Sequence, residues 1–299
     1  MNRMILRAVL FTGVIVVGAL TLSRLTAQEP ASLPETKAPA PVQAAPSTTA
    51  PALSPSGHPL NDYWIAHDKQ ILTDFGWLAH FKEANMKLGP PAAGENRVVF
   101  MGDSITAGWH LDESFPGKPY INRGIGGQTT PQMLVRFRQD VIDLKPKVVV
   151  ILAGINDIAG NTGPMTLEQT EDNLASMAEL ARANHIRVVL CSVTPAFDFP
   201  WSPGMTPAPK VIALNEWIKS YAREKGDVYV DYHSAMKDGR DGLPASLSKD
   251  GVHPLPAGYA VMTPLAEAGI EKAEKTGTEG LGDGALSSIA TRPNTPLSQ

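Results

Sequence analysis

The sequence predicts an α/β fold, a three-layer sandwich in which helices cover both faces of a parallel β-sheet. Short apolar, β-branched runs alternate along the chain with longer segments whose apolar residues recur every three or four positions. The runs at 148–152 and 188–193 are continuously apolar, as expected of strands that are buried on both faces of a parallel sheet. Right-handed connections between such strands place the helices on the two faces.

Five short extended runs are expected to be the strands, namely 97–101, 120–122, 147–152, 187–193 and 228–230. Between them, three segments have helical apolar spacing. Their apolar residues are Met133, Phe137, Val141 and Leu144; then Leu174, Met177, Ala178 and Ala181; and then Val211, Leu214, Ile218 and Tyr221. Gly226 should cap the third helix, and Pro256 should begin a closing helix that runs to about Lys275. One opening helix is expected over about 62–88.

The folded domain is predicted to span residues 60–274, with segments of biased composition on both sides. Residues 28–59 contain eight prolines among Ala, Ser and Thr, which indicates a flexible, partly extended linker. Residues 275–299 are rich in Gly, Ser, Thr and Pro and are expected to form a disordered tail.

Residues 1–27 have the pattern of an export signal. Arg3 and Arg7 flank the start of an apolar run, 8–22, and 25–27 (Leu-Thr-Ala) offers a cleavage site. The run is shorter than the roughly 18 residues of a spanning helix, which favours a cleaved signal over an uncleaved membrane anchor. Both alternatives predict export to the periplasm or the extracellular space, with membrane contact only through this segment.

The net charge limits the classes of binding partner, and the cysteine content limits the possible covalent links. The net charge is −4 without a basic stripe, so no nucleic-acid partner is predicted. The only cysteine, Cys191, rules out an internal disulfide and an N-terminal lipid-modified cysteine. Because Cys191 ends an apolar run, we expect it to be a buried strand thiol.

Four short segments carry the residue types that catalyse acyl transfer. They are 102–105 (Gly-Asp-Ser-Ile), 126–129 (Gly-Gly-Gln-Thr), 154–157 (Gly-Ile-Asn-Asp) and 250–253 (Asp-Gly-Val-His). The first three follow predicted strands, and open α/β sheets bind ligands at the edge where the strands end. We therefore expect a nucleophile, oxyanion donors and a base with its carboxylate to meet there.

Ser104 is the candidate nucleophile, because it lies where the first strand ends and a helix should begin. Gly127 follows the second strand, where the missing side chain lets a backbone N–H approach a ligand oxygen. Asn156 follows the third strand, and its amide is suited to donate to a developing oxyanion. Each residue also has a structural alternative, a helix cap for Ser104 and a turn for the other two.

His253 is the candidate base. Pro254 keeps it out of helical geometry, and a turn at Asp250 and Gly251 brings a carboxylate within reach of Nδ1. Such a carboxylate fixes the tautomer of the imidazole and stabilises the imidazolium. The alternatives are a surface loop histidine and a metal ligand. The other six histidines show no metal-ligand spacing, so neither a metal nor another cofactor is predicted.

From about residue 97 to the closing helix, these segments resemble the blocks of the SGNH hydrolase superfamily, also called GDSL esterases and lipases. The resemblance implies a flavodoxin-like, five-stranded parallel sheet in the order 2-1-3-4-5. It also implies that Ser104, Asp250 and His253 are catalytic, and that Ser104, Gly127 and Asn156 form the oxyanion hole.

Two local features refine this resemblance. Residues 122–130 are similar to the subfamily of platelet-activating-factor acetylhydrolase-like enzymes. Ile105 stands where the name of the GDSL motif has leucine, which is a conservative difference.

The aromatic, proline-rich segment 195–201 is expected to wall the substrate pocket. Its side chains Phe197, Phe199 and Trp201, together with Trp109, suit a sugar ring or a lipid chain equally. A loop that folds onto its own core is the structural alternative.

The predicted function is a serine esterase that works through an acyl-enzyme. Its expected substrates are small acyl esters, acetyl first, of a small molecule or a glycan. One alternative is a lysophospholipase or thioesterase that acts on longer acyl chains. Two others are a metal-dependent phosphoesterase that uses Asp103, Asp157 and His253, and a non-catalytic carbohydrate-binding module.

Overall fold

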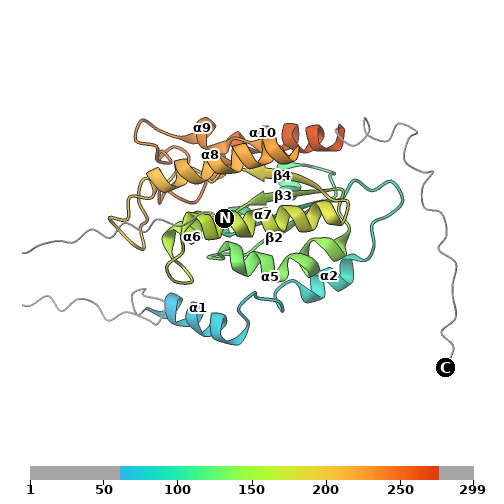
Figure 1. The fold of residues 1–299 in the computed structure, drawn as a ribbon, viewed down its shortest axis with the longest axis horizontal. Helices are drawn as coiled ribbons and strands as arrows, with labels where there is room; N and C mark the ends of the chain where they lie inside the picture. Colours follow the sequence, from blue (N-terminus) through green and yellow to red (C-terminus); the bar gives the residue numbers. More distant parts are fainter. Residues whose placement is uncertain (1–60, 276–299) are drawn as a thin grey trace, which may run out of the picture. The chain divides into compact units, whose positions relative to one another are not determined.

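The structure, a computed structural model, describes residues 61–275, which are built around one central sheet (Figure 1). The predictions for 1–60 and 276–299, among them the export signal and the linker, lie outside the described residues. The five strands are parallel and have the order β2-β1-β3-β4-β5. They are β1 (Val98–Gly102), β2 (Tyr120–Gly124), β3 (Val148–Leu152), β4 (Arg187–Cys191) and β5 (Val228–Val230). The predicted fold class and strand order are confirmed.

Helices cover the sheet on both sides. They are α1 (Asp62–Thr73), α2 (Lys82–Leu88), α3 (Ser104–Ala107), α4 (Leu111–Ser114), α5 (Thr130–Asp140), the 3₁₀ helix η1 (Ile142–Leu144), α6 (Ile155–Ala159), α7 (Leu167–Ala183), α8 (Ala208–Lys225), α9 (Tyr232–Met236) and α10 (Pro256–Lys275). Helices α5, α7 and α8 pack in sequence along one face, and α10 packs on β3, β4 and β5 from the other, next to α4 and α9 (Figure 1).

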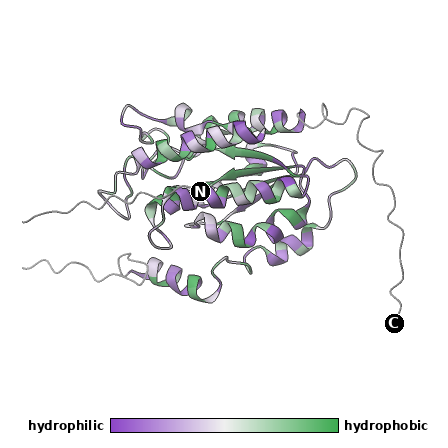
Figure 2. Cartoon of the chain, in the orientation of Figure 1, coloured by the Kyte–Doolittle hydropathy of each residue, from purple (hydrophilic) through white to green (hydrophobic). Residues whose placement is uncertain are grey.

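The strands are apolar because both of their faces are covered. Every residue of β1 and β3 is buried, and Figure 2 shows the strands as apolar and the helices as a mixture of polar and apolar residues. Cys191 is buried in β4, as predicted. Within residues 61–275, no helix is long and apolar enough to cross a membrane.

The predicted opening helix is wrong in one respect, since it is interrupted between α1 and α2. The cause is Asp74, whose two carboxylate oxygens accept hydrogen bonds from the backbone N–H groups of Leu78 and Ala79 at 2.9 and 3.0 Å. Side-chain bonds of this kind compete with the helical pattern, so the chain turns here. The closing helix and the Gly226 cap of α8 agree with prediction.

The helix predicted from Met133 to Leu144 is also shorter than expected. Helix α5 ends at Asp140, and the apolar spacing continues into the tighter turn of η1, which Lys145 ends in the left-handed conformation. Hydrophobic spacing alone does not distinguish one α-helix from an α-helix followed by a 3₁₀ turn, because both can bury the same face.

Candidate active site

The carboxyl ends of β2, β1 and β3, three neighbouring strands, are level. Gly102 at the end of β1 pairs with Gly124 of β2 and with Leu152 of β3. The segments that follow these strands therefore leave the sheet at the same level along the strand direction. This register places the predicted site residues of three separate loops at the same edge, as expected of an open α/β sheet.

The chain after β1 turns directly into α3. A side chain at Gly102 would approach Thr106 Oγ1 to 2.1 Å, so only glycine fits at this turn. The cap of α3 is Asp103, whose side chain accepts from the N–H of Ile105 at 2.9 Å. Ser104 is therefore the first residue of the helix and its side chain is not the cap, which leaves its hydroxyl available for another contact.

Ser104 and His253 lie in hydrogen-bond contact, although 149 positions separate them in the sequence. Ser104 Oγ is 2.9 Å from His253 Nε2. On the other side of the ring, His253 Nδ1 is 2.6 Å from Asp250 Oδ2. A hydroxyl, an imidazole and a carboxylate in this order can remove a proton from the hydroxyl oxygen and stabilise the imidazolium that forms.

Backbone groups hold the Asp250 carboxylate in place. Oδ1 accepts from the N–H groups of Val252 and His253 at 3.0 and 2.8 Å, and from the hydroxyl of Ser248 at 3.0 Å. Desolvation raises the pKa of Asp250, but the hydrogen bonds from the His253 ring and these N–H groups outweigh it and lower the pKa to about 2. The carboxylate is thus ionised at neutral pH, with Oδ2 directed at the imidazole. Ser248 was not among the predicted residues.

The loop after β2 lies between Ser104 and Asn156. A Cβ atom placed on Gly126 would be 3.9 Å from Ser104 Cβ, and the amide Nδ2 of Asn156 donates to the carbonyl oxygen of Gln128 at 3.0 Å. Gly127, between them, has a φ of 75°, a left-handed conformation that favours glycine. The structure thus brings the segments that carry Ser104, Gly127 and Asn156 next to one another.

Two buried acids, Asp103 and Asp157, adjoin Ser104 and Asn156 in the chain. Asp103 is 1% exposed, and burial raises its pKa to about 7. Burial likewise raises the pKa of Asp157 to about 6, while Thr130 donates to its carboxylate from both the backbone N–H and the hydroxyl. Both carboxylates hold backbone N–H groups at helix starts. Within residues 61–275, no group of three or more His, Cys, Asp or Glu side chains is placed to hold a metal ion.

A buried guanidinium connects the loops after β1 and β2. Arg136 of α5 has no exposed surface, and it donates to the Gln128 side chain at 2.6 Å and to the Gly102 carbonyl at 3.1 Å. Asp140, one helical turn away, forms an ion pair with it. Sequence reasoning missed this residue, and the Arg–Asp spacing of four on helix α5 was the available signal.

The four aromatic residues predicted to wall the pocket have different environments. Trp201 is half-buried, and its ring lies 6.1 Å from the His253 ring. Phe199 is completely buried and stacks on Trp201 at 5.1 Å. Phe197 is 44% exposed, with the Arg240 guanidinium 4.7 Å from its ring. Of these three loop residues, Trp201 is the one beside the catalytic candidates.

Trp109 is buried, and its indole N–H donates to the Ser114 hydroxyl at 3.0 Å. It nevertheless lines a pocket of about 600 Å³ together with Pro254 and Tyr259. Because Pro254 follows His253 in the chain, this pocket adjoins the segment that carries the candidate base.

Helix α1 reaches the loop after β2 at Gly127. A Cβ atom placed on Gly127 would lie 3.1 Å from the Tyr63 hydroxyl and 3.8 Å from the His67 ring. Tyr63 is 59% exposed, and its ring stacks on His67 with the centroids 6.3 Å apart. Sequence reasoning missed both residues because they follow no strand. Their spacing of four on one helix face was the only available signal.

Comparison with known proteins agrees with this geometry. The GDSL-like lipase/acylhydrolase family matches residues 100–261. A GDSL-like lipase from Bacteroides thetaiotaomicron is 46% identical, with a TM-score of 0.65; the similarity covers 67% of this chain and 100% of that one. The acetylxylan esterase of Geobacillus stearothermophilus is 28% identical over 224 residues, which are 62% of this chain and 98% of that protein.

A third relative is the uncharacterized lipoprotein YqeF of Bacillus subtilis, 31% identical over 129 residues. The chain spans only 53% of the length of that relative, in a match that covers 37% of the chain itself. The family match at 100–261 includes all five predicted catalytic and oxyanion residues, whereas Tyr63 and His67 precede it.

Proposed function

The chain belongs to the GDSL-like lipase/acylhydrolase family and is a carboxylic ester hydrolase, and from this premise we propose that it is a serine esterase with Ser104 as nucleophile. His253 Nε2 takes the hydroxyl proton as Ser104 Oγ attacks the ester carbonyl carbon. Asp250 holds the His253 ring and stabilises the imidazolium. The observation that carries the proposal is the chain of contacts from Ser104 to His253 and Asp250, at 2.9 and 2.6 Å.

The attack produces a tetrahedral intermediate with a negatively charged oxygen. The N–H groups of Ser104 and Gly127 and the side-chain amide of Asn156 are the proposed donors to it. The intermediate expels the alcohol, which receives the proton from His253. A water molecule then attacks the acyl-enzyme, His253 removes one of its protons, and the released acid leaves Ser104 with its hydroxyl restored.

The first test is hydrolysis of an activated acetyl ester by the wild type and by Ser104→Ala. Loss of the nucleophile should lower kcat by about 10⁴-fold or more. Asn184→Ala, which changes an exposed amide at the end of α7, is the matched control and should keep full activity. A folded Ser104→Ala protein that retains most of the activity would contradict the assignment of the nucleophile.

We further propose that the substrates are small acyl esters, with acetyl preferred, on a carbohydrate or another polar alcohol. Trp201 provides aromatic surface beside His253 and Tyr63 beside Gly127, and aromatic rings stack on sugar rings. The acetylxylan esterase relative, similar over nearly its whole length, supports the same substrate class. The alternative is a longer acyl chain bound along the pocket beside Trp109.

The substrate proposal is tested with acetyl, butyryl and palmitoyl esters of a single alcohol. We expect kcat/KM to be highest for the acetyl ester. If kcat/KM rises with chain length, the enzyme is a lysophospholipase or thioesterase of longer acyl chains.

We propose that residues 1–27 export the enzyme. Cell fractionation combined with N-terminal analysis of the purified protein tests this. A mature protein that begins near Gln28 indicates a cleaved signal, and an intact N-terminus in the membrane fraction indicates an anchor. Full-length protein confined to the cytoplasm would contradict export.

A further inference from the structure

The short segment after α6, residues 160–163, contacts both loops that supply the proposed oxyanion donors. We propose that Asn161 in this segment is a positioning residue, whose single side-chain amide sets the orientation of both Gly127 and Asn156. This inference rests on the proposed esterase function and adds to it a residue that does not itself touch the substrate.

The contacts of Asn161 involve both donors. Its Nδ2 atom donates to the carbonyl oxygen of Gly127 at 3.1 Å and to Oδ1 of Asn156 at 3.0 Å. The two protons of this amide nitrogen are thus directed at Gly127 and at Asn156, which are the proposed sources of the oxyanion donors besides Ser104. Asn161 is 2% exposed, so solvent offers little competition for these bonds.

The arrangement determines which end of the Asn156 amide faces the substrate. The Gly127 carbonyl can only accept, so the Asn161 atom beside it must be the nitrogen. That nitrogen then requires an acceptor on Asn156, which presents Oδ1 to it. Asn156 Nδ2 must therefore point the other way, and among residues 61–275 its only protein partner is the Gln128 carbonyl at 3.0 Å. One of its two protons remains for an oxyanion.

The local backbone fixes Asn161 in this position. Gly160 ends α6 in the left-handed conformation, with a φ of 74°. The N–H of Asn161 then donates to the carbonyl oxygen of Asn156 at 3.0 Å. The next residue, Thr162, places its hydroxyl 3.1 Å from the hydroxyl of Thr129, which joins the segment to the loop after β2.

A role in folding stability alone explains the Asn161 side chain less well than the positioning role does. Oδ1 of Asn161 is buried and has no hydrogen-bond partner among the described residues. A buried polar atom without a partner is destabilising. A side chain selected only for stability would not need that oxygen, whereas the nitrogen beside it has two defined acceptors.

The test compares Asn161→Ala with Asn161→Asp, two variants that differ in charge and size. For Asn161→Ala we expect kcat to fall about 10- to 100-fold, somewhat less than on loss of an oxyanion donor itself, with KM within about threefold. Asn161→Asp keeps the shape but cannot donate, and it repels both oxygens. We therefore expect it to lower kcat further than Asn161→Ala. Equal kcat in both variants and the wild type would overturn the proposal.

A third variant tests for rescue and guards against loss of folding. Asn161→Ser restores one hydroxyl donor and should recover part of the kcat lost in Asn161→Ala. All variants are compared after urea unfolding has established that they are folded. A serine variant no more active than alanine, in proteins of equal stability, would contradict a role through hydrogen bonding.

The matched control is Asn215→Ala. Asn215 is 6% exposed, and its side-chain amide binds the N–H and the carbonyl of Val193, away from the oxyanion donors. We expect this variant to be less stable but to keep kcat within about threefold, because a structural amide affects folding more than the transition state. A loss of kcat as large as in Asn161→Ala would show that any buried amide has this effect.

A double-mutant cycle shows whether Asn161 acts through Asn156. In the Asn156→Ala background, Asn161→Ala should lower kcat by much less than it does in the wild type, because coupled residues are non-additive. Fully additive losses would overturn the coupling. Ser104→Ala tests the nucleophile independently. If the wild type is active and the Asn161 variants keep its full kcat, this inference fails while the proposed esterase function stands.

Discussion

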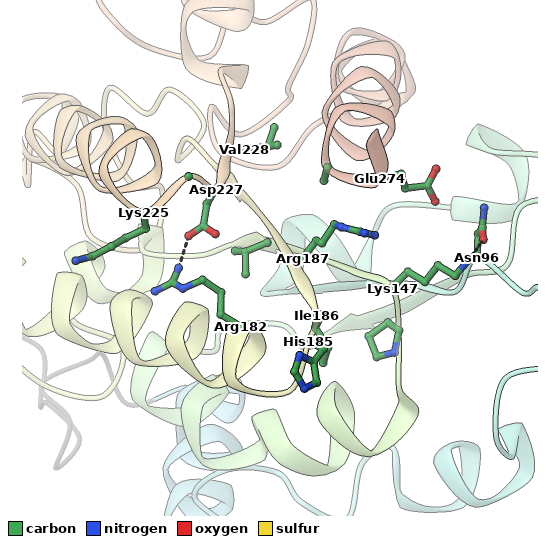
Figure 3. A pocket seen from close by; sticks show the side chains of 14 residues that line it. Asn96, Lys147, Arg182, His185, Ile186, Arg187, Lys225, Asp227, Val228 and Glu274 are labelled. Carbon is green, nitrogen blue, oxygen red and sulfur yellow. Dashed lines mark hydrogen bonds and ion pairs between the residues drawn. The ribbon is translucent and has the colours of Figure 1, made fainter. Parts of the chain in front are cut away.

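The two edges of the sheet both carry charged and polar side chains, but these side chains are organised differently. At the amino edge, where the strands begin, a pocket of about 750 Å³ is lined by Lys147, Arg182, Arg187, Lys225 and Asp227, among others (Figure 3). At the carboxyl edge, the hydroxyl of Ser104 contacts a histidine that a carboxylate orients. The amino edge thus has a large pocket and several cations. Among residues 61–275, no comparable series of hydroxyl, imidazole and carboxylate contacts is found there.

Two cations of the amino edge bind neighbouring side chains. Arg182 forms an ion pair with Asp227, and Lys147 donates to the side chain of Asn96 (Figure 3). Helices α7 and α8 both end here, with Arg182 and Lys225 in their last turns. Cations at the ends of helices offset the negative end of the helix dipole. We therefore base the proposed active site at the carboxyl edge on directed hydrogen bonds, because pocket volume and charge alone would favour the amino edge.

If the carboxyl edge is the active one, the largest loss of kcat among the variants below is expected from Asp250→Asn. An amide cannot stabilise the imidazolium and can favour the wrong tautomer of His253, so kcat should fall by the order of 10⁴. Steady-state kinetics on a small ester measures it. A loss below tenfold in a folded variant would show that the carboxylate is dispensable.

The next largest effect is expected from Asn156→Ala. Removal of one oxyanion donor should lower kcat by about 10²- to 10³-fold with little change in KM. The measurement is the separate determination of kcat and KM. A change in KM alone would mean that Asn156 binds the ground state of the substrate instead.

Asp103→Asn tests whether the buried Asp103 carboxyl titrates in the folded protein. The measured quantity is the pH dependence of folding stability. Burial raises the pKa of Asp103 to about 7, above the value of roughly 3.9 expected in the unfolded chain. Between these values the folded protein binds the extra proton, so its stability falls as the pH rises from about 4 to about 7. Asparagine can also cap α3 but does not titrate.

We therefore expect the stability of Asp103→Asn, relative to the wild type, to be greater at pH 8 than at pH 5. Urea unfolding of both proteins at the two pH values measures this difference. A difference that does not change with pH would show that Asp103 is ionised in the folded protein throughout this range.

The smallest effect on catalysis is expected at the amino edge. Arg187 begins β4, a five-residue strand whose first and last residues are about 13 Å apart. Arg187→Ala should leave kcat/KM within about twofold for a small acetyl ester. A drop of tenfold or more would mean that substrate reaches the amino edge, and the distinction between the two edges would fail.

Much of the fold and part of the site followed from local sequence. The continuous apolar runs predicted β3 and β4, because burial on both faces leaves no room for polar positions. Ser104 and Asn156 were predicted because each follows a strand, and level strand ends bring such positions together. The split between α1 and α2 was missed, since it depends on hydrogen bonds from a single side chain, Asp74.

The supporting residues were harder to predict, because their roles depend on contacts between distant segments. Asn161 is significant only once the loops after β2 and β3 are side by side. Tyr63 belongs to a helix far from the other segments in the sequence, and nothing local indicates that this helix reaches Gly127. Arg136 looks like a surface cation in the sequence, but it is buried beneath the loops after β1 and β2.

The central claim is that Ser104 at the carboxyl edge is the activated nucleophile. Its most direct test is treatment of the wild type with a fluorophosphonate, followed by mass spectrometry of the peptides. Because this reagent requires an activated serine, we predict stoichiometric modification of Ser104, abolished in Ser104→Ala and strongly slowed in His253→Ala. Modification of a different serine, or no modification of a folded, ester-hydrolysing protein, would contradict the account.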